Sequence, residues 1–178
     1  IFFLFDPTIN PDFRRFISDS EDPQLLSKVS DQQDIILAET EVRIKRLLGL
    51  NRHDKVDTPF AVVLGKCDSW INKEGIGEIK DPIVDGKLDL NAVESNSNVV
   101  RSILEEHCPY VVANAERISS DVRYFATSAF GHTPLKFADE KGAEFIAPDP
   151  SKIKPMFIEI PTMWALSKVM PEIVPSFR

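Results

Sequence analysis

The sequence has few cysteines and histidines, and this scarcity excludes several kinds of site. Its 178 residues include 2 cysteines and 3 histidines. Cys67 and Cys108 form no CxxC pair and have no neighbouring pair of histidines, so neither a zinc site nor a disulfide framework is predicted. The histidines lie on separate segments, so no Ser-His-Asp or Cys-His constellation can be assembled. We therefore identify no catalytic residue and no metal ligand, and a reducing cytoplasm fits best.

Basic clusters and long apolar runs are also missing. The formal net charge is -7, and lysine and arginine form no block longer than a pair such as Arg14-Arg15. A surface that binds nucleic acid or an anionic membrane needs more cations than this. The opening run IFFLF is far shorter than the roughly 20 residues of a membrane span and lacks the basic region of a signal peptide. We expect a cytoplasmic protein without a nucleic-acid or membrane partner.

The length and the 43% hydrophobic content are those of one domain with a proper core. We expect strands at 1–5, 58–65 and 122–129, and helices at 10–17, 24–48, 92–107, 110–118 and 161–170. Because residues 1–5 begin directly in a buried strand, we expect the chain to be part of a longer protein. We interpret residues 71–91 as an irregular excursion and 131–152 as a loop, with 154–160 as an edge strand or an extended segment.

The order of these elements predicts the fold class. Strand alternates with helix, whose usual solution is an α/β domain with a mostly parallel sheet and helices on both faces. The continuous apolar run 58–65 fits a strand buried on both faces. In the long helix we expect Leu25, Val29, Ile36, Val42 and Leu47 to form the buried stripe, and Glu39, Glu41, Arg43, Lys45 and Arg46 to form the solvated face.

Ligands of such sheets bind at the carboxyl ends of the strands. Three segments follow predicted strands: residues 6–8, residues 65–68 with the sequence GKCD, and residues 127–129 with the sequence TSA. The Asp68 carboxylate can accept two parallel hydrogen bonds from N1-H and N2-H of guanine. The stem of Lys66 can lie along the base while its ammonium stays hydrated. A backbone N-H of the Ser128-Ala129 turn can donate to guanine O6.

Each of these features also has a structural interpretation. Lys66 and Asp68 can form a surface ion pair, and Ser128 and Ala129 can form an ordinary turn of small residues. Trp70 can be a structural aromatic instead of a wall of the base pocket. Residues 6–8 can form a local turn instead of approaching a phosphate. His132, which follows the third turn, can lie near a ribose or base.

The two turns GKCD and TSA resemble the fourth and fifth guanine-recognition motifs of Ras-like P-loop GTPases, (N/T)KxD and SA(K/L). More narrowly, the chain resembles the C-terminal half of bacterial double-GTPase-type domains of the TRAFAC clade. The resemblance is carried by FLFDPT, ILAETEVRIKRLLGL, TPFAVVLGKCDSW, VRYFATSAFGHTP and IKPMFIEIPTMWAL.

The resemblance implies a three-layer Ras-like fold, of which residues 1–178 are the C-terminal portion with about three core strands. Its irregular excursion is 71–91, and its C-terminal loop and helix are 131–178. Lys66, Asp68, Ser128 and Ala129 would bind the base of GTP or GDP. Mg²⁺ and the phosphates would be held by an N-terminal half outside this chain, and the intact protein would be a GTP-hydrolysing switch whose partners are its own other domains.

Three departures from the family pattern keep a second interpretation open. The sequence contains no G-x-x-x-x-G-K-[ST], Ile9 stands where a DxxG motif starting at Asp6 needs glycine, and Gly65 replaces the Asn or Thr of the fourth motif. We therefore expect no GTP hydrolysis by residues 1–178 alone. The alternative is a degenerate, nucleotide-free α/β module that serves as an interaction scaffold.

Overall fold

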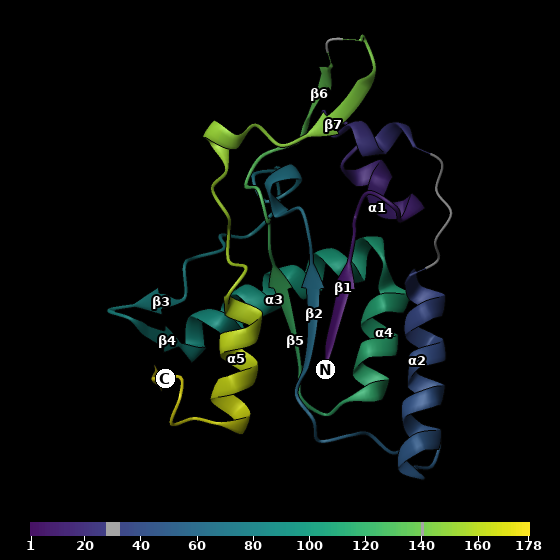
Figure 1. The fold of residues 1–178 in the computed structure, drawn as a ribbon. Helices are drawn as coiled ribbons and strands as arrows, with labels where there is room; N and C mark the ends of the chain where they lie inside the picture. Colours follow the sequence, from purple (N-terminus) through teal and green to yellow (C-terminus); the bar gives the residue numbers. More distant parts are fainter. Residues whose placement is uncertain (28–32, 140) are drawn as a thin grey trace.

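A parallel sheet forms the centre of the molecule (Figure 1). In this computed structural model, which describes residues 1–27, 33–139 and 141–178, the sheet has three strands in the order β1-β2-β5. They are β1 (Phe2–Phe5), β2 (Phe60–Leu64) and β5 (Val122–Ala126). Phe5 pairs with Leu64, which pairs with Ala126, so the three strands end at the same edge. The predicted α/β class and parallel sheet are confirmed.

Helices surround this sheet. The α-helices are α1 (Pro11–Phe16), α2 (Gln33–Leu48), α3 (Leu90–His107), α4 (Pro109–Ile118) and α5 (Ile160–Val169), and the 3-10 turns are Pro23–Leu26, Cys67–Ser69 and Pro150–Lys152. The predicted break at Pro109 is confirmed. A proline lacks the N-H that would continue α3, and it fits the first turn of α4.

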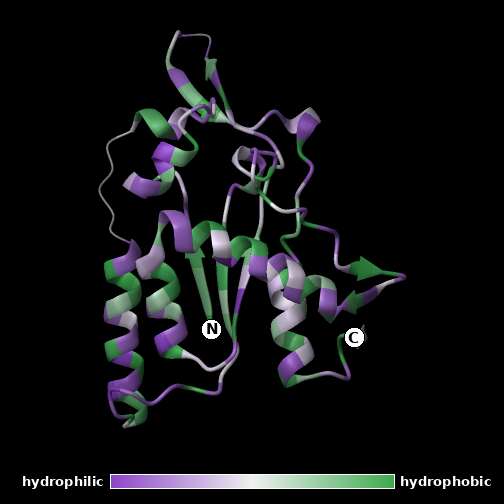
Figure 2. Ribbon diagram, turned by 180° about the vertical axis from the view of Figure 1, so that it is seen from behind, coloured by the Kyte–Doolittle hydropathy of each residue, from purple (hydrophilic) through white to green (hydrophobic). Residues whose placement is uncertain are grey.

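Successive side chains of β2 point to opposite faces and define the layers. Phe60, Val62 and Leu64 join one buried cluster with residues of α1, α3 and α4, whereas Ala61 and Val63 join a second cluster with Trp164 of α5. Figure 2 colours the strands of the central sheet mostly green, as expected for strands buried between layers.

β1 is less well covered than its neighbours. Phe2 and Leu4 pair with Ala61 and Val63, so their side chains lie on the face that α5 covers over β2. These two side chains remain 53% and 70% exposed.

The helix expected over residues 24–48 is shorter, and the buried face predicted for its part from Ile36 to Leu47 is wrong, whereas Leu25 packs against the core. Residues 23–26 form a separate 3-10 turn, α2 begins at Gln33, and Val29 lies outside the described residues. Ile36, Val42 and Leu47 are exposed, whereas the buried residues of α2 are Gln33, Leu37, Glu41 and Lys45.

Pairing makes the burial of the α2 charges possible. Lys45 Nζ lies 2.9 Å from Glu41 Oε1, and it also donates to the Arg52 carbonyl at 2.7 Å. Arg117 of α4 lies 3.0 Å from the second oxygen of Glu41. Buried charges are tolerated when partners satisfy them. The interpretation of Glu41 and Lys45 as solvated residues is therefore wrong.

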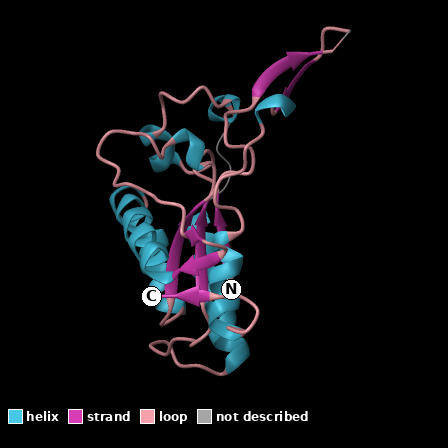
Figure 3. Cartoon of the chain, turned by 90° about the vertical axis from the view of Figure 1, so that its left-hand side faces the viewer, coloured by secondary structure: helices cyan, strands magenta, loops and turns pink. Residues whose placement is uncertain are grey.

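The two segments predicted to be irregular contain short strands. Residues 71–91 include the antiparallel pair β3 (Ile83–Val84) and β4 (Lys87–Asp89), and β8 (Ser176–Phe177) runs parallel to β4. Residues 131–152 include the hairpin of β6 (Leu135–Ala138) and β7 (Glu144–Ala147), which projects from the body in Figure 3. Residues 154–160 form no edge strand: Met156 makes one antiparallel bridge to Ser128, and α5 begins at Ile160.

Gln33 joins the end of β1 to α2. Its side-chain carbonyl accepts from Asp6 N-H at 2.8 Å, and its amide donates to the Asp6 carbonyl at 2.9 Å. We expect Gln33→Leu to lower the free energy of unfolding by about 1–3 kcal/mol, because Asp6 N-H loses its acceptor and the Asp6 carbonyl keeps only the long hydrogen bond from Ile9 N-H, at 3.4 Å. Urea unfolding measures this change. Glu39→Gln, on the exposed face of the same helix, is the control; equal effects of the two substitutions would contradict the assigned role of Gln33.

Candidate functional site

The turns after β2 and β5 meet at the carboxyl edge of the sheet. Thr127 N-H donates to the Leu64 carbonyl at 3.0 Å, and Cys67 N-H donates to the Thr127 carbonyl at 2.9 Å. These bonds hold the two predicted recognition segments side by side. Lys66, Asp68, Ser128 and Ala129 all line one cavity of about 250 Å³.

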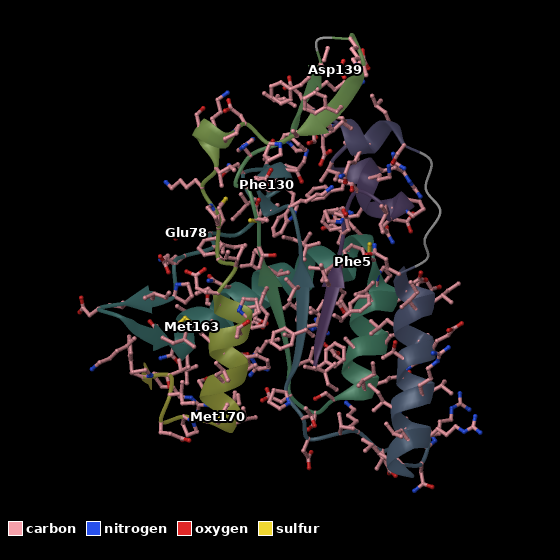
Figure 4. The ribbon with its side chains drawn as sticks, in the orientation of Figure 1. Phe5, Glu78, Phe130, Asp139, Met163 and Met170 are labelled. Atoms are coloured by element: carbon pink, nitrogen blue, oxygen red, sulfur yellow. The ribbon has the colours of Figure 1, made fainter. Side chains whose placement is uncertain are left out.

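The other walls of this cavity combine apolar and polar groups. Phe5 and Phe130, labelled in Figure 4, both contribute to the lining. Asp6, Asp22 and Gln24 add polar groups from the segment that follows β1. Asp22 and Gln24 were not predicted as site residues, because they belong to no strand end and reach the cavity only through the tertiary fold.

Asp68 presents a free carboxylate to the cavity. It lies in the 3-10 turn Cys67–Ser69 and is half-buried. Within residues 1–27, 33–139 and 141–178, its side chain makes no hydrogen bond and no ion pair. Both carboxylate oxygens are therefore available to accept hydrogen bonds from a ligand.

Lys66 is held by neighbours other than Asp68. Its backbone is left-handed, with φ 50° and ψ 42°, which is uncommon for a residue with a side chain. Its ammonium donates to Thr8 Oγ1 at 2.8 Å and to Asp22 Oδ2 at 3.3 Å, and it also contacts Gln24 Oε1. The Lys66 to Asp68 ion pair considered as an alternative is not formed among the described residues.

Ser128 and Ala129 have different roles in the fifth-motif segment. Ser128 N-H already donates to the Met156 carbonyl at 3.0 Å, and its hydroxyl accepts from Gly131 N-H at 2.9 Å. Ala129 is exposed, and its N-H has no acceptor in the part of the chain that the structure describes. Ser128 thus stabilises the turn, and Ala129 has the backbone donor that is open to a ligand.

The structure also places the remaining candidates. Trp70 is fully buried and its indole N-H donates to the Gly65 carbonyl at 3.2 Å, which supports the structural interpretation. Asp6 Oδ1 accepts from Thr8 N-H at 2.8 Å, so residues 6–8 form the expected local turn. His132 lines the cavity, and its Nδ1 lies 2.9 Å from the Thr133 carbonyl oxygen.

A metal centre and a membrane span are not seen in the described residues. No three His, Cys, Asp or Glu side chains there are grouped so that they could hold a metal ion together. None of the helices in those residues has both the length and the apolar character required to cross a membrane.

Comparisons with models of protein families, with curated protein sequences and with solved structures find no match to this chain. By its own fold and site, the chain is an α/β protein with a parallel sheet and a cavity at the carboxyl ends of the strands.

Gly131 fixes the loop beside the cavity. Its φ is +69°, and an added Cβ would lie 1.9 Å from the Lys154 carbonyl oxygen. We expect Gly131→Ala to lower the free energy of unfolding by about 2–4 kcal/mol, because backbone must move to relieve the clash. The control is Gly142→Ala, where φ is +80° but no atom of the described residues lies within 4 Å of an added Cβ. Chemical denaturation should show a smaller loss, about 1 kcal/mol, for the control; equal losses would contradict the clash.

Both cysteines are buried, and burial raises the pKa of each thiol to about 12. The thiolate is the reactive form, so at pH 8 both groups should be protonated and inert. We expect Ellman's reagent to titrate 2 thiols per unfolded chain in guanidinium chloride and almost none in the native protein. Rapid native labelling of either cysteine would show that its pocket opens.

Proposed function

We propose that this chain recognises the guanine base of GTP or GDP through Lys66, Asp68 and Ala129, with Ser128 stabilising the turn that presents Ala129. The observation that carries the proposal is that the Asp68 carboxylate and the Ala129 N-H, which have no partner among the described residues, belong to residues that line one cavity at the ends of two adjacent parallel strands. Parallel sheets bind ligands at this edge.

The chemistry of the cavity matches guanine better than adenine. A carboxylate can accept the adjacent N1-H and N2-H donors of guanine as a charge-assisted fork, and Ala129 N-H can donate to O6. Adenine carries an acceptor at N1, which would face the Asp68 carboxylate, and a donor at N6, which would face Ala129 N-H. Both mismatches leave polar groups unpaired, which costs binding free energy.

In this proposal the chain is the C-terminal, base-reading part of a Ras-like TRAFAC GTPase domain in a larger cytoplasmic protein of the bacterial double-GTPase type. Mg²⁺-dependent hydrolysis would need a phosphate loop, which the printed sequence does not contain. The exposed Phe2 and Leu4 side chains on β1 support a further domain of that protein as a partner, because parallel sheets are ordinarily covered on both faces.

A second candidate function is an interaction scaffold without nucleotide. The projecting hairpin favours it. Leu135, Phe137 and Phe145 are all more than a third exposed, and the rings of Phe137 and Phe145 stack at a centroid distance of 5.8 Å. A two-stranded hairpin with exposed aromatic side chains is typical of a contact surface for another protein.

Titration with fluorescent GTP and ATP tests the proposed function. We expect GTP to bind at least tenfold more tightly than ATP, and Asp68→Asn to abolish this preference, because the amide cannot accept both donors. Asp68 has no partner among the described residues, so this substitution should leave stability unchanged. Asp85→Asn, in the β3-β4 turn, is the matched control. Equal binding of both nucleotides, or of neither, would favour the scaffold.

A further inference from the structure

The ammonium of Lys66 has no hydrogen-bond donor left for a ligand. An ammonium carries three N-H groups. Its three acceptors here are Thr8 Oγ1 at 2.8 Å, Asp22 Oδ2 at 3.3 Å and Gln24 Oε1. Each donor therefore has an acceptor within the protein.

The charge of Lys66 is compensated as well. Asp22 Oδ2 lies 3.3 Å from Nζ, and Asp6 Oδ1 lies 3.6 Å from it. The Asp22 side chain is only 3% exposed, so solvent screens this pair less than a surface pair. Two carboxylates thus neutralise the ammonium that would otherwise attract a phosphate.

The acceptors of Lys66 belong to a well-anchored segment. Asp22 also accepts from Gln24 N-H at 2.9 Å, which caps the turn Pro23–Leu26. Arg14 of α1 donates to the carbonyls of Gln24 at 3.3 Å and Ser27 at 2.9 Å. Because its acceptors are anchored in this way, moving Lys66 toward a phosphate would break its own hydrogen bonds to Thr8, Asp22 and Gln24.

The cavity as a whole is therefore unfavourable for anions. Its walls carry the carboxylates of Asp6, Asp22 and Asp68, and among its described lining residues Lys66 is the only lysine or arginine. What Lys66 offers a ligand is its methylene stem, a flat apolar surface suited to an aromatic ring. The volume of about 250 Å³ also lies below the roughly 300–1,000 Å³ of sites for larger ligands.

We infer that the ligand class of this cavity is the guanine nucleoside, and that phosphate groups add nothing to binding by this chain. Asp22 and Asp6 produce this selectivity by occupying the Lys66 ammonium. The inference rests on the proposed function, since it assumes that the cavity recognises guanine.

Isothermal titration calorimetry of the 178-residue chain with guanosine, GMP, GDP and adenosine tests the inference. We expect the dissociation constants of the three guanine ligands to agree within about threefold and adenosine to bind at least tenfold more weakly, a difference of about 1.4 kcal/mol. GDP binding tenfold or more tightly than guanosine would overturn this inference and leave the proposed function standing. Equal binding of guanosine and adenosine, or no binding of any guanine ligand, would overturn both.

Asp22→Asn tests the role of the carboxylates directly. The substitution removes one negative charge beside Lys66, so the ratio of GDP affinity to guanosine affinity should rise at least threefold. Asp19→Asn, which alters an exposed partner of Lys73 outside the cavity, is the matched control. If Asp22→Asn does not fold by circular dichroism, Asp6→Asn replaces it, because the Asp6 side chain is 35% exposed. An unchanged ratio of GDP to guanosine affinity in the folded variant would refute the assignment.

Discussion

The backbone hydrogen bond from Cys67 N-H to the Thr127 carbonyl, 2.9 Å long, is the constraint on which the candidate site depends. It continues the pairing of β2 with β5 past the last paired residues, Leu64 and Ala126. Because parallel strands end at the same edge, two segments far apart in the sequence reach one cavity. Together with the hydrogen bond from Thr127 N-H to the Leu64 carbonyl, 3.0 Å long, it holds the turn that carries Asp68 against the segment that carries Ala129.

Lys66 and Asp68 lie two residues apart, but their side chains differ in whether they have partners within the protein. The Lys66 ammonium is bound by Thr8, Asp22 and Gln24, whereas Asp68 has no partner in the described part of the chain. In the proposed function, specificity thus comes from the Asp68 carboxylate and the Ala129 N-H. Lys66 contributes the apolar surface of its methylene stem. The unpaired carboxylate is the basis of the proposed guanine recognition, and the occupied ammonium is the basis of the proposed insensitivity to phosphate.

The face that α2 buries shows how tertiary contacts override a sequence pattern. Charged residues are ordinarily exposed, and that rule predicted Glu41 and Lys45 to be solvated. Arg117 of α4 and the Arg52 carbonyl supply partners that no local pattern reveals. The consequence is an outer face of α2 that carries Ile36, Val42 and Leu47.

The sequence by itself determined the three core strands, their parallel α/β arrangement, the break at Pro109 and the meeting of residues 65–68 with 127–129. Apolar runs and prolines act locally, and chain connectivity places the ends of parallel strands together. Only the tertiary structure decided that Ser128 stabilises its turn while Ala129 is open, and that Asp22 and Gln24 hold Lys66. It also decided the two small strand pairings in 71–91 and 131–152. These features depend on contacts between residues distant in sequence, and segments as short as Lys87–Asp89 carry too little periodicity to predict them.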